Sequence, residues 1–309
     1  MKINKREFTA KDLVSIRDFL VNSYKEIGRP YNWTVERLNF ALSLDRVMNG
    51  VAMEDWEKRV SIWESDGEMI GVVTTEGNGS NWFFQLKQKD ISKSLLEKMF
   101  DHVEQNFPIN DEGELLYEVQ LRIPGGDELR EGMAQERGYE KSTKWHEVIS
   151  ILDIDKRPNP GLPDGFIIKD GDQVTDQEKG IAHAKAFDYL GTLYDKRSPV
   201  GYEIMRNMPD YRSDLDLYVV SEETGEIVSF CTIWYDRENR IGILEPVGTH
   251  PEFRRRGLAR AVIAEGIDRI ASEGAKEAHV GSSQEFYKAI GFEERYSNFI
   301  WKKTIGEGK

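Results

Sequence analysis

The chain of 309 residues contains a single cysteine, Cys231. An intrachain disulfide is therefore excluded, and this cysteine usage fits a reducing, cytoplasmic compartment. Because Cys231 lies in the apolar run 227–234, we interpret it as a packed small hydrophobe and not as a nucleophile. The five histidines are scattered and the cysteine has no partner, so we expect no metal site.

Long hydrophobic runs are also missing, and residues 1–7 are rich in charge. We therefore expect neither a secretion signal nor a membrane span, and no membrane partner. Positive charge is scarce, because the net charge is −13, which argues against nucleic acid as a partner. A composition of 39% hydrophobic and 31% charged residues is typical of a soluble globular protein.

The middle of the chain contains a stretch rich in proline and glycine, Lys156–Gly165. Such a composition continues neither a helix nor a central strand, so the stretch is a predicted linker. On either side the chain repeats itself, since the strand-turn-strand pattern of 61–73 recurs at 217–229. We predict a duplicated unit, with domains at 1–155 and 166–309 joined by the linker 156–165.

Hydrophobic periodicity supports the same order of elements in both halves. Predicted helices and final strands occupy 9–24, 91–107, 145–152, 176–190, 258–275 and 299–304. The stretch Gly191–Asp216 reads as loop-rich. The expected fold class is α/β, with a mixed sheet and helices on its faces.

One run in the second half predicts an anion site. An apolar strand carrying Glu245 leads into a basic loop with three consecutive arginines, and Gly257 then opens an amphipathic helix. Backbone N–H groups at a helix start are unpaired, and the helix dipole adds positive potential there. General nucleotide binding by a phosphate loop is disfavoured, because no Gly-Lys-Ser/Thr follows the loop.

Within this run, Arg254, Gly257 and Ala259 match the pattern Arg/Gln-x-x-Gly-x-Gly/Ala. The run resembles the acyl-CoA-binding signature of the GCN5-related N-acetyltransferases (GNAT). The resemblance implies two tandem GNAT-like domains, with acetyl-CoA as a co-substrate. It implies that the co-substrate is bound by Val247, Gly248, Thr249, Arg254, Arg255, Arg256, Gly257, Leu258, Ala259 and Arg260. The corresponding segment 82–90 has neither glycine nor arginine, so the first domain is predicted to be a degenerate copy without this site.

Two residues are candidates for the chemistry. Glu245 is a carboxylate in an apolar strand, where burial favours the uptake of a proton from an amine, directly or through water. A solvent-facing glutamate is the alternative. Tyr287 lies four residues before the pair Gly291-Phe292, where the family has a tyrosine that acts as a general acid; a core tyrosine is the alternative. His250 is interpreted as a surface or capping histidine, and a general base or a phosphate contact is the less favoured alternative.

Two further positions, Val280 and Pro246, bear on the predicted site. Val280 stands where the family usually has an asparagine that helps to hold CoA, and Ser282 and Ser283 are candidate substitutes. Pro246 cannot donate a ladder hydrogen bond, so strand pairing should be interrupted next to Glu245. In the family the strand separates from its neighbour at this point.

The sequence therefore predicts a cytoplasmic N-acetyltransferase that moves an acetyl group from acetyl-CoA to a primary amine by direct transfer. Its acceptor would be a small-molecule or peptide amine, and the protein a monomer or homodimer. The alternative is a non-catalytic acyl-CoA-binding sensor or scaffold that keeps the site and transfers nothing.

Overall fold

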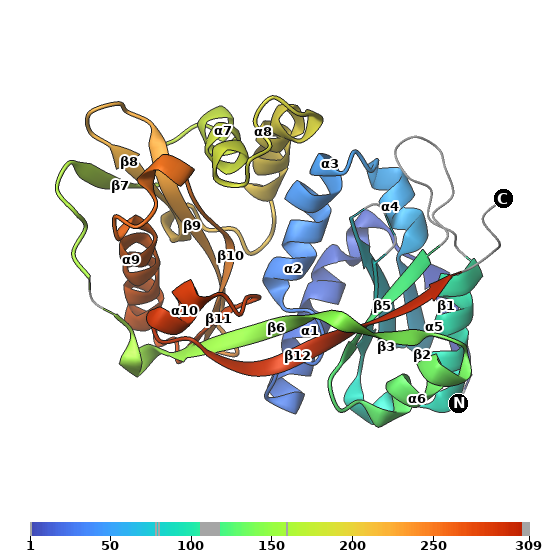
Figure 1. The fold of residues 1–309 in the computed structure, drawn as a ribbon. Helices are drawn as coiled ribbons and strands as arrows, with labels where there is room; N and C mark the ends of the chain where they lie inside the picture. Colours follow the sequence, from blue (N-terminus) through green and yellow to red (C-terminus); the bar gives the residue numbers. More distant parts are fainter. Residues whose placement is uncertain (1, 78, 80, 106–117, 159, 305–309) are drawn as a thin grey trace. The chain divides into compact units, whose positions relative to one another are not determined.

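The computed structural model describes residues 2–77, 79, 81–105, 118–158 and 160–304 (Figure 1). The chain divides into two compact units. Unit 1 comprises Met1–Thr34, Asn49–Val148 and Tyr296–Lys309, and unit 2 comprises Val35–Met48 and Ile149–Arg295.

These units are not the contiguous domains 1–155 and 166–309 that the sequence repeats suggested. A helical segment of the first half, Val35–Met48, belongs to unit 2, and the end of the chain, Tyr296–Lys309, belongs to unit 1. The stretch 156–165, expected to be a linker between domains, lies within unit 2. After its first residue, the described residues of that stretch form no helix or strand, as its prolines and glycines predict.

Unit 1 is built on a mixed sheet with the strand order β1-β2-β3-β4-β5-β12. Its strands are β1 (Ile3–Glu7), β2 (Ser61–Ser65), β3 (Glu68–Glu76), β4 (Asn81–Leu86), β5 (Glu118–Pro124), the first part of β6 (Glu140–Asp153) and most of β12 (Glu293–Thr304). In this order β4 and β5 are parallel and the other neighbours are antiparallel. Its helices are η1 (Ala10–Asp12), α1 (Leu13–Ile27), α4 (Met53–Arg59), η3 (Gln88–Asp90), α5 (Lys93–Gln105) and α6 (Glu128–Glu136).

The core of unit 1 lies between this sheet and α5. The apolar stripe predicted for that helix is buried: Leu96, Met99, Phe100 and Val103. Phe107, the last member of the predicted stripe, lies outside the described residues. Trp301 of β12 is 6% exposed and packs into the same core. The last strand of the chain therefore completes the core of the first unit.

Unit 2 repeats the arrangement, with the strand order β6-β11-β10-β9-β8-β7. Its strands are β7 (Phe166–Asp170), β8 (Asp216–Ser221), β9 (Ile227–Asp236), β10 (Ile241–Thr249), β11 (Glu277–Val280) and the end of β6. Only β10 and β11 are parallel among these neighbours. Its helices are α2 (Val35–Phe40), η2 (Ala41–Asp45), α3 (Arg46–Met48), η4 (Ile154–Lys156), α7 (Asp176–Ala186), α8 (Leu193–Met205), η5 (Ser213–Leu215), η6 (Pro251–Phe253), α9 (Leu258–Ser272) and α10 (Glu285–Ala289).

Helices cover both faces of this second sheet. Along β8 and β9 alternate side chains point to opposite faces, so Leu217 and Cys231 pack in the cluster under α9, while Tyr218 and Phe230 pack with α7. Cys231 is fully buried, and burial raises the pKa of its thiol. The interpretation of Cys231 as a packed small hydrophobe is confirmed. None of the helices in the described ranges is long and apolar enough to cross a membrane.

The expected loop-rich stretch 191–216 is wrong in its first part, where α8 forms around Pro199. The proline ring lies against α7, since a Cβ on Gly180 would come within 2.7 Å of Pro199 Cγ. On another side α8 packs against the segment Val35–Met48, and a Cβ on Gly201 would lie 2.9 Å from Leu44 Cδ2. Packing thus stabilises a helix that proline alone would disfavour.

The assignment of β12 to unit 1 predicts where a core mutation acts. Replacing Trp301 with alanine should destabilise unit 1 by roughly 3–5 kcal/mol, because it leaves a cavity in the core under α5. Trp145→Ala on β6 is the matched control, since that ring is 54% exposed and its loss should cost about 0.5 kcal/mol or less. Hydrogen exchange read separately for the two units measures both effects. Equal losses of stability in the two variants, or a loss of hydrogen-exchange protection confined to unit 2, would contradict the assignment of β12 to unit 1.

Candidate functional site

The centre of unit 2 is a place where two parallel strands separate. The parallel pairing of β10 with β11 runs from Ile241 to Ile243, the last pair being Ile243 with His279. The pairing of β10 with β9 shifts its register between Leu244 and Val247. The interruption predicted next to Pro246 is confirmed, and beyond it β10 has a strand partner on one side only.

The free side of β10 exposes particular backbone groups. The N–H of His250 donates to Val228 O of β9 at 2.9 Å. Because backbone groups alternate along a strand, the N–H and C=O of Val247 and Thr249 point away from β9, into the gap. The Thr249 carbonyl accepts from Arg254 Nε at 3.2 Å. The gap is thus lined by the backbone of Val247 and the N–H of Thr249.

The loop after β10 opens onto the start of α9. Gly257 has a φ of +83° as N-cap, and no side chain caps this helix start. Its first helical bond runs from the Ala261 N–H to the Gly257 carbonyl. The N–H groups of the first helical turn therefore point outward, and Arg255, with a φ of +65°, turns the preceding backbone the same way.

Four arginines surround this helix start, and within the described ranges none forms a salt bridge. Arg254 braces the loop, donating to Thr249 O and, at 2.9 Å, to Ala186 O. Arg256 lies over the ring of Phe253 at 4.8 Å. Arg255 and Arg260 are exposed and line a cavity. The combination of open N–H groups and uncompensated cations suits an anion.

The cavity has a volume of about 950 Å³ and extends from the helix start to α10. It brings together most of the predicted residues: Val247, Gly248, Thr249, Arg254, Arg255, Gly257, Leu258, Ala259, Arg260 and Tyr287. Two predicted residues, Arg256 and Glu245, do not line it. Its other walls, which the sequence did not indicate, are Ala186, Phe187, Phe253, Gln284, Glu285, Phe286, Ala289 and Ile290.

Glycine is required at one position of this wall. A Cβ on Gly248 would lie 2.3 Å from Phe230 Cζ and 2.9 Å from Ala186 Cβ. The strand can therefore approach α7 only because Gly248 has no side chain.

Tyr287 and Glu245 stand in different surroundings. Tyr287 is 7% exposed, and burial, with the charge of Glu245 as a smaller cause, raises the pKa of its phenol. The hydroxyl therefore stays protonated at neutral pH. Glu245 is half-buried in β10, and its carbonyl accepts from Trp234 Nε1 at 2.7 Å. The charge of Glu245 reaches the phenol, so the two side chains belong to one electrostatic site.

Two polar side chains near the cavity, those of His250 and Ser282, have structural partners. His250 caps η6, accepting at Nδ1 from the Glu252 N–H at 3.2 Å, which is the capping role expected of it. Neither Ser282 nor Ser283 lines the cavity, whereas Gln284 does. The Ser282 hydroxyl accepts from the Gln284 N–H at 3.2 Å.

Unit 1 has the same strand separation, but protein side chains occupy it. The parallel pairing of β4 with β5 ends at Phe83. Beyond it, the Phe84 carbonyl accepts from Arg130 Nη1 at 3.0 Å. Asn32 bonds the Leu86 backbone twice, through Nδ2 to the carbonyl at 2.8 Å and through Oδ1 to the N–H at 2.9 Å. The backbone groups that are open in β10 are satisfied internally in β4.

The guanidinium in this gap is itself held by a buried cluster. Arg130 is 1% exposed and pairs with Asp127 at 2.6 Å, while its guanidinium carbon lies 4.6 Å from the ring centre of Tyr31. Tyr31 donates its hydroxyl to the same carboxylate. At the following helix, Ser92 Oγ accepts from the Leu95 N–H, so α5 has the side-chain cap that α9 lacks.

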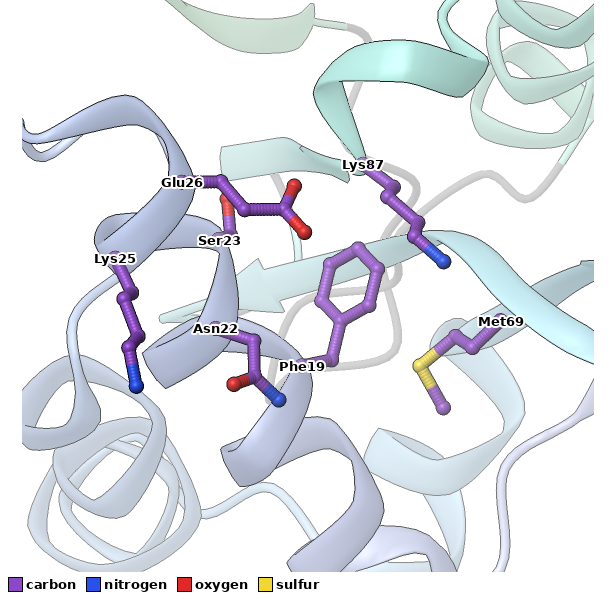
Figure 2. Close-up of a pocket in the computed structure, with 7 residues that line it drawn as sticks. All are labelled: Phe19, Asn22, Ser23, Lys25, Glu26, Met69 and Lys87. Carbon is purple, nitrogen blue, oxygen red and sulfur yellow. The ribbon is translucent and has the colours of Figure 1, made fainter. Parts of the chain in front are cut away.

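A smaller cavity of about 350 Å³ lies in unit 1 between α1 and the β3–β4 edge (Figure 2). Its two cations, Lys25 and Lys87, lie on opposite sides of the ring of Phe19 (Figure 2). Lys87 pairs with Glu68 at 2.8 Å. This cavity therefore has no converging set of cations like that at α9. In the described parts of both units, no group of three or more histidine, cysteine, aspartate or glutamate side chains is placed to hold a metal ion.

Known proteins resemble this chain in sequence and in structure. Residues 185–292 match the model of the acetyltransferase (GNAT) family. A protein named an acetyltransferase from Pectobacterium atrosepticum is 33% identical over 82 residues, which is 26% of this chain and 57% of that protein. Another from Photorhabdus laumondii is 39% identical over 61 residues, 20% of this chain and 41% of that protein. The chain thus spans about half the length of these curated relatives.

Two solved structures match nearly the whole chain in fold. A tandem GNAT protein from the clavulanic acid biosynthesis pathway has a TM-score of 0.67 at 12% identity and covers 100% of both chains. A GCN5-related N-acetyltransferase from Sphaerobacter thermophilus has a TM-score of 0.62 at 16% identity and covers 99% of this chain and 97% of that one. The fold is that of tandem acetyltransferase proteins. The residues that match the GNAT family model, 185–292, lie in unit 2.

The buried cluster in unit 1 makes a prediction about pH. Burial alone would raise the pKa of Asp127. Its interactions with Arg130, Tyr31 and a backbone N–H together outweigh burial, so the pKa is lowered. Arg130→Met leaves that carboxylate buried and unpaired, and should destabilise unit 1 by roughly 3–5 kcal/mol at neutral pH. The stabilisation from the ionised Asp127 is present above its unfolded pKa of about 4 and disappears as pH falls through the lower folded value. The difference between variant and wild type should therefore shrink in acid.

Urea unfolding from pH 7 to pH 3, with hydrogen exchange assigning the transition to unit 1, measures this difference. Lys93→Met is the control, because its ammonium pairs with Glu136 at the exposed surface and its loss should cost about 1 kcal/mol or less. A cost for Arg130→Met that does not change with pH would show that Asp127 is not the group left unpaired.

Proposed function

We propose that unit 2 transfers an acetyl group from acetyl-CoA to a primary amine. The observation that carries the proposal is the 950 Å³ cavity, which joins the open, arginine-rich start of α9 to the buried phenol of Tyr287. Phosphate groups fit the first end, because backbone N–H donors and uncompensated cations favour anions. An extended arm fits the gap beside β10, where the backbone of Val247 can bond it as a strand would.

The side chains have complementary roles in this reaction. Acetyl-CoA supplies an acetyl thioester. Glu245 accepts a proton from the amine nitrogen, directly or through water, as the new C–N bond forms. The N–H of Val247 can stabilise the charge that develops on the carbonyl oxygen. Tyr287 gives its proton to the sulfur as the C–S bond breaks, and regains one from water.

The transfer is direct, without an acyl-enzyme intermediate. Cys231 is the single cysteine of the chain, and it is fully buried with a raised pKa. Burial of this kind keeps a thiol protonated and unreactive. The amine itself is then the nucleophile that attacks the thioester.

Unit 1 has a structural role in this proposal. Arg130 and Asn32 satisfy the backbone groups of β4 beside the separated strands, and Ser92 caps α5. The first unit thus retains the fold of a cofactor-binding domain while its own side chains fill the place of the arm.

The positive φ of Gly257 predicts that backbone strain alone, without a steric clash, weakens CoA binding at the start of α9. A side chain on Gly257 meets open space, but its φ of +83° is unfavourable for a β-branched residue by about 1–2 kcal/mol. Gly257→Val should therefore weaken CoA binding about tenfold, measured by calorimetry. Gly274→Val at the other end of α9 has the same open space and a φ of +91°, and should leave the affinity unchanged. Equal weakening by both variants would mean that general destabilisation of the helix is responsible.

The proposed acid and base give a kinetic prediction. Tyr287→Phe and Glu245→Gln should each lower kcat about 10²–10⁴-fold while acetyl-CoA still binds. Release of CoA thiol is followed with n-butylamine, spermidine, kanamycin, lysine and a peptide with a free N-terminus. Because the pKa of Tyr287 is raised, its ionisation should not reduce the rate up to the ordinary tyrosine range near pH 10.

An absence of thiol release with every amine, despite measurable acetyl-CoA binding, would overturn the enzymatic proposal. It would favour a protein that binds acyl-CoA without transferring the acyl group.

A further inference from the structure

Two buried polar atoms on uncharged side chains of unit 2 lack a hydrogen-bond partner within the described parts of the chain. They are the hydroxyl of Tyr202 on α8 and Oδ1 of Asn39 on α2. Both residues are 1% exposed. The other amide atom of Asn39 is satisfied, since Nδ2 donates to Asp210 Oδ2 at 3.0 Å. A buried polar atom without a partner is costly, so natural proteins pair it with water or a ligand.

Asn39 comes from a helix that packs against the strand carrying Glu245, and Tyr202 comes from α8, which packs against the same helical segment. The segment containing α2 packs against α8, and α2 also packs against β9 and β10. Burial, with smaller contributions from Asp216 and other charges including Glu245, raises the pKa of Tyr202. The phenol therefore lies within electrostatic reach of the Glu245 carboxylate. The β10 backbone is fixed at this point, because Trp234 Nε1 donates to the Glu245 carbonyl.

The neighbouring buried polar groups, in contrast, are satisfied. Asp216 accepts from Lys179 at 2.9 Å, from Tyr211 and Tyr218 at 2.8 Å, and from Thr232 at 2.6 Å. The carboxylate of Asp216 is thus fully paired, whereas single oxygens of Tyr202 and Asn39 are left open. These oxygens are better explained by a partner that the protein does not itself provide.

We propose that Tyr202 and Asn39 form an acceptor subsite that positions the amine beside Glu245. This inference rests on the proposed function and specifies its substrate class. The phenol oxygen, the amide oxygen and the carboxylate can each accept a hydrogen bond, which matches the three N–H groups of a primary ammonium on binding. The ammonium loses one proton to water before the attack, and Glu245 takes a second as the C–N bond forms. Tyr202 and Asn39 are positioning residues, and Glu245 remains the group that takes the proton.

The subsite also gives a function to α2, the helix of the first half of the sequence that belongs to unit 2. Asn39 lies in the first half of the sequence, yet α2 belongs to unit 2. The first half therefore supplies one wall of the acceptor subsite, although its own sheet has no phosphate-binding helix start.

The test compares two removals of a tyrosine hydroxyl within one unit. Tyr202→Phe removes an unpartnered oxygen, so thermal stability should stay equal or rise, while kcat/KM for the amine falls about tenfold or more. Acetyl-CoA affinity by calorimetry should be unchanged. Tyr218→Phe is the matched control: its buried hydroxyl donates to Asp216, so its loss should lower Tm without changing KM for the amine. The amine used is the member of the panel with the fastest thiol release.

A second measurement does not depend on turnover. In a high-resolution crystal structure of the acetyl-CoA complex soaked with n-butylamine, a water or the amine nitrogen should lie within about 3.2 Å of the Tyr202 hydroxyl. A dry hydroxyl, or one bonded to the protein, together with unchanged amine kinetics in Tyr202→Phe, would overturn the subsite. If no amine is turned over but the soaked amine occupies this place, the transfer reaction fails and the subsite stands.

Discussion

The separation of β10 from β11 after the Ile243–His279 pair is the constraint on which the candidate site depends. A parallel sheet that stayed paired would have no unsatisfied backbone between these strands, and no passage from the start of α9 to Tyr287. The register shift at Leu244–Val247 ends the pairing and turns the backbone of Val247 into the gap. The loop that follows then brings the open end of a helix to the same cavity. The open backbone of β10, the passage to the start of α9 and the position of the candidate acid are therefore consequences of one local irregularity.

The first unit shows what the same separation requires when no ligand fills it. Open backbone groups inside a protein must find partners, and in β4 they find Arg130 and Asn32. The guanidinium in turn needs a buried carboxylate, which Asp127 provides. A separated strand pair without a ligand thus needs more than the absence of a glycine-arginine motif, because a connected polar cluster has to satisfy the open backbone groups.

Local features of the candidate site could be predicted from the sequence, whereas the unit to which each helix and strand belongs could not. The motif from Arg254 to Ala259 located the helix start, and Pro246 located the strand irregularity, because both act through local backbone chemistry. The helix α8 was missed because the stretch 191–216 reads as loop-rich, whereas tertiary packing against Gly180 and Leu44 stabilises the helix. The placement of α2 and β12 could not be predicted, since a strand's own residues do not encode which of two similar sheets it joins. Arg130 gave no signal either, because a lone arginine on an amphipathic helix reads as a surface residue.

The membership of Tyr296–Lys309 in unit 1 has a consequence for how the protein is made. On the ribosome, the strand that pairs with β5 emerges after the other described helices and strands of both units. Until then the N-terminal half is a nascent domain with an uncovered sheet edge and a core that lacks Trp301. Such an edge is prone to mispairing, so the nascent chain must be protected or must stay incompletely folded until β12 has been made. Removal of β12 would therefore damage the core of the first unit, although this strand is encoded after the second unit.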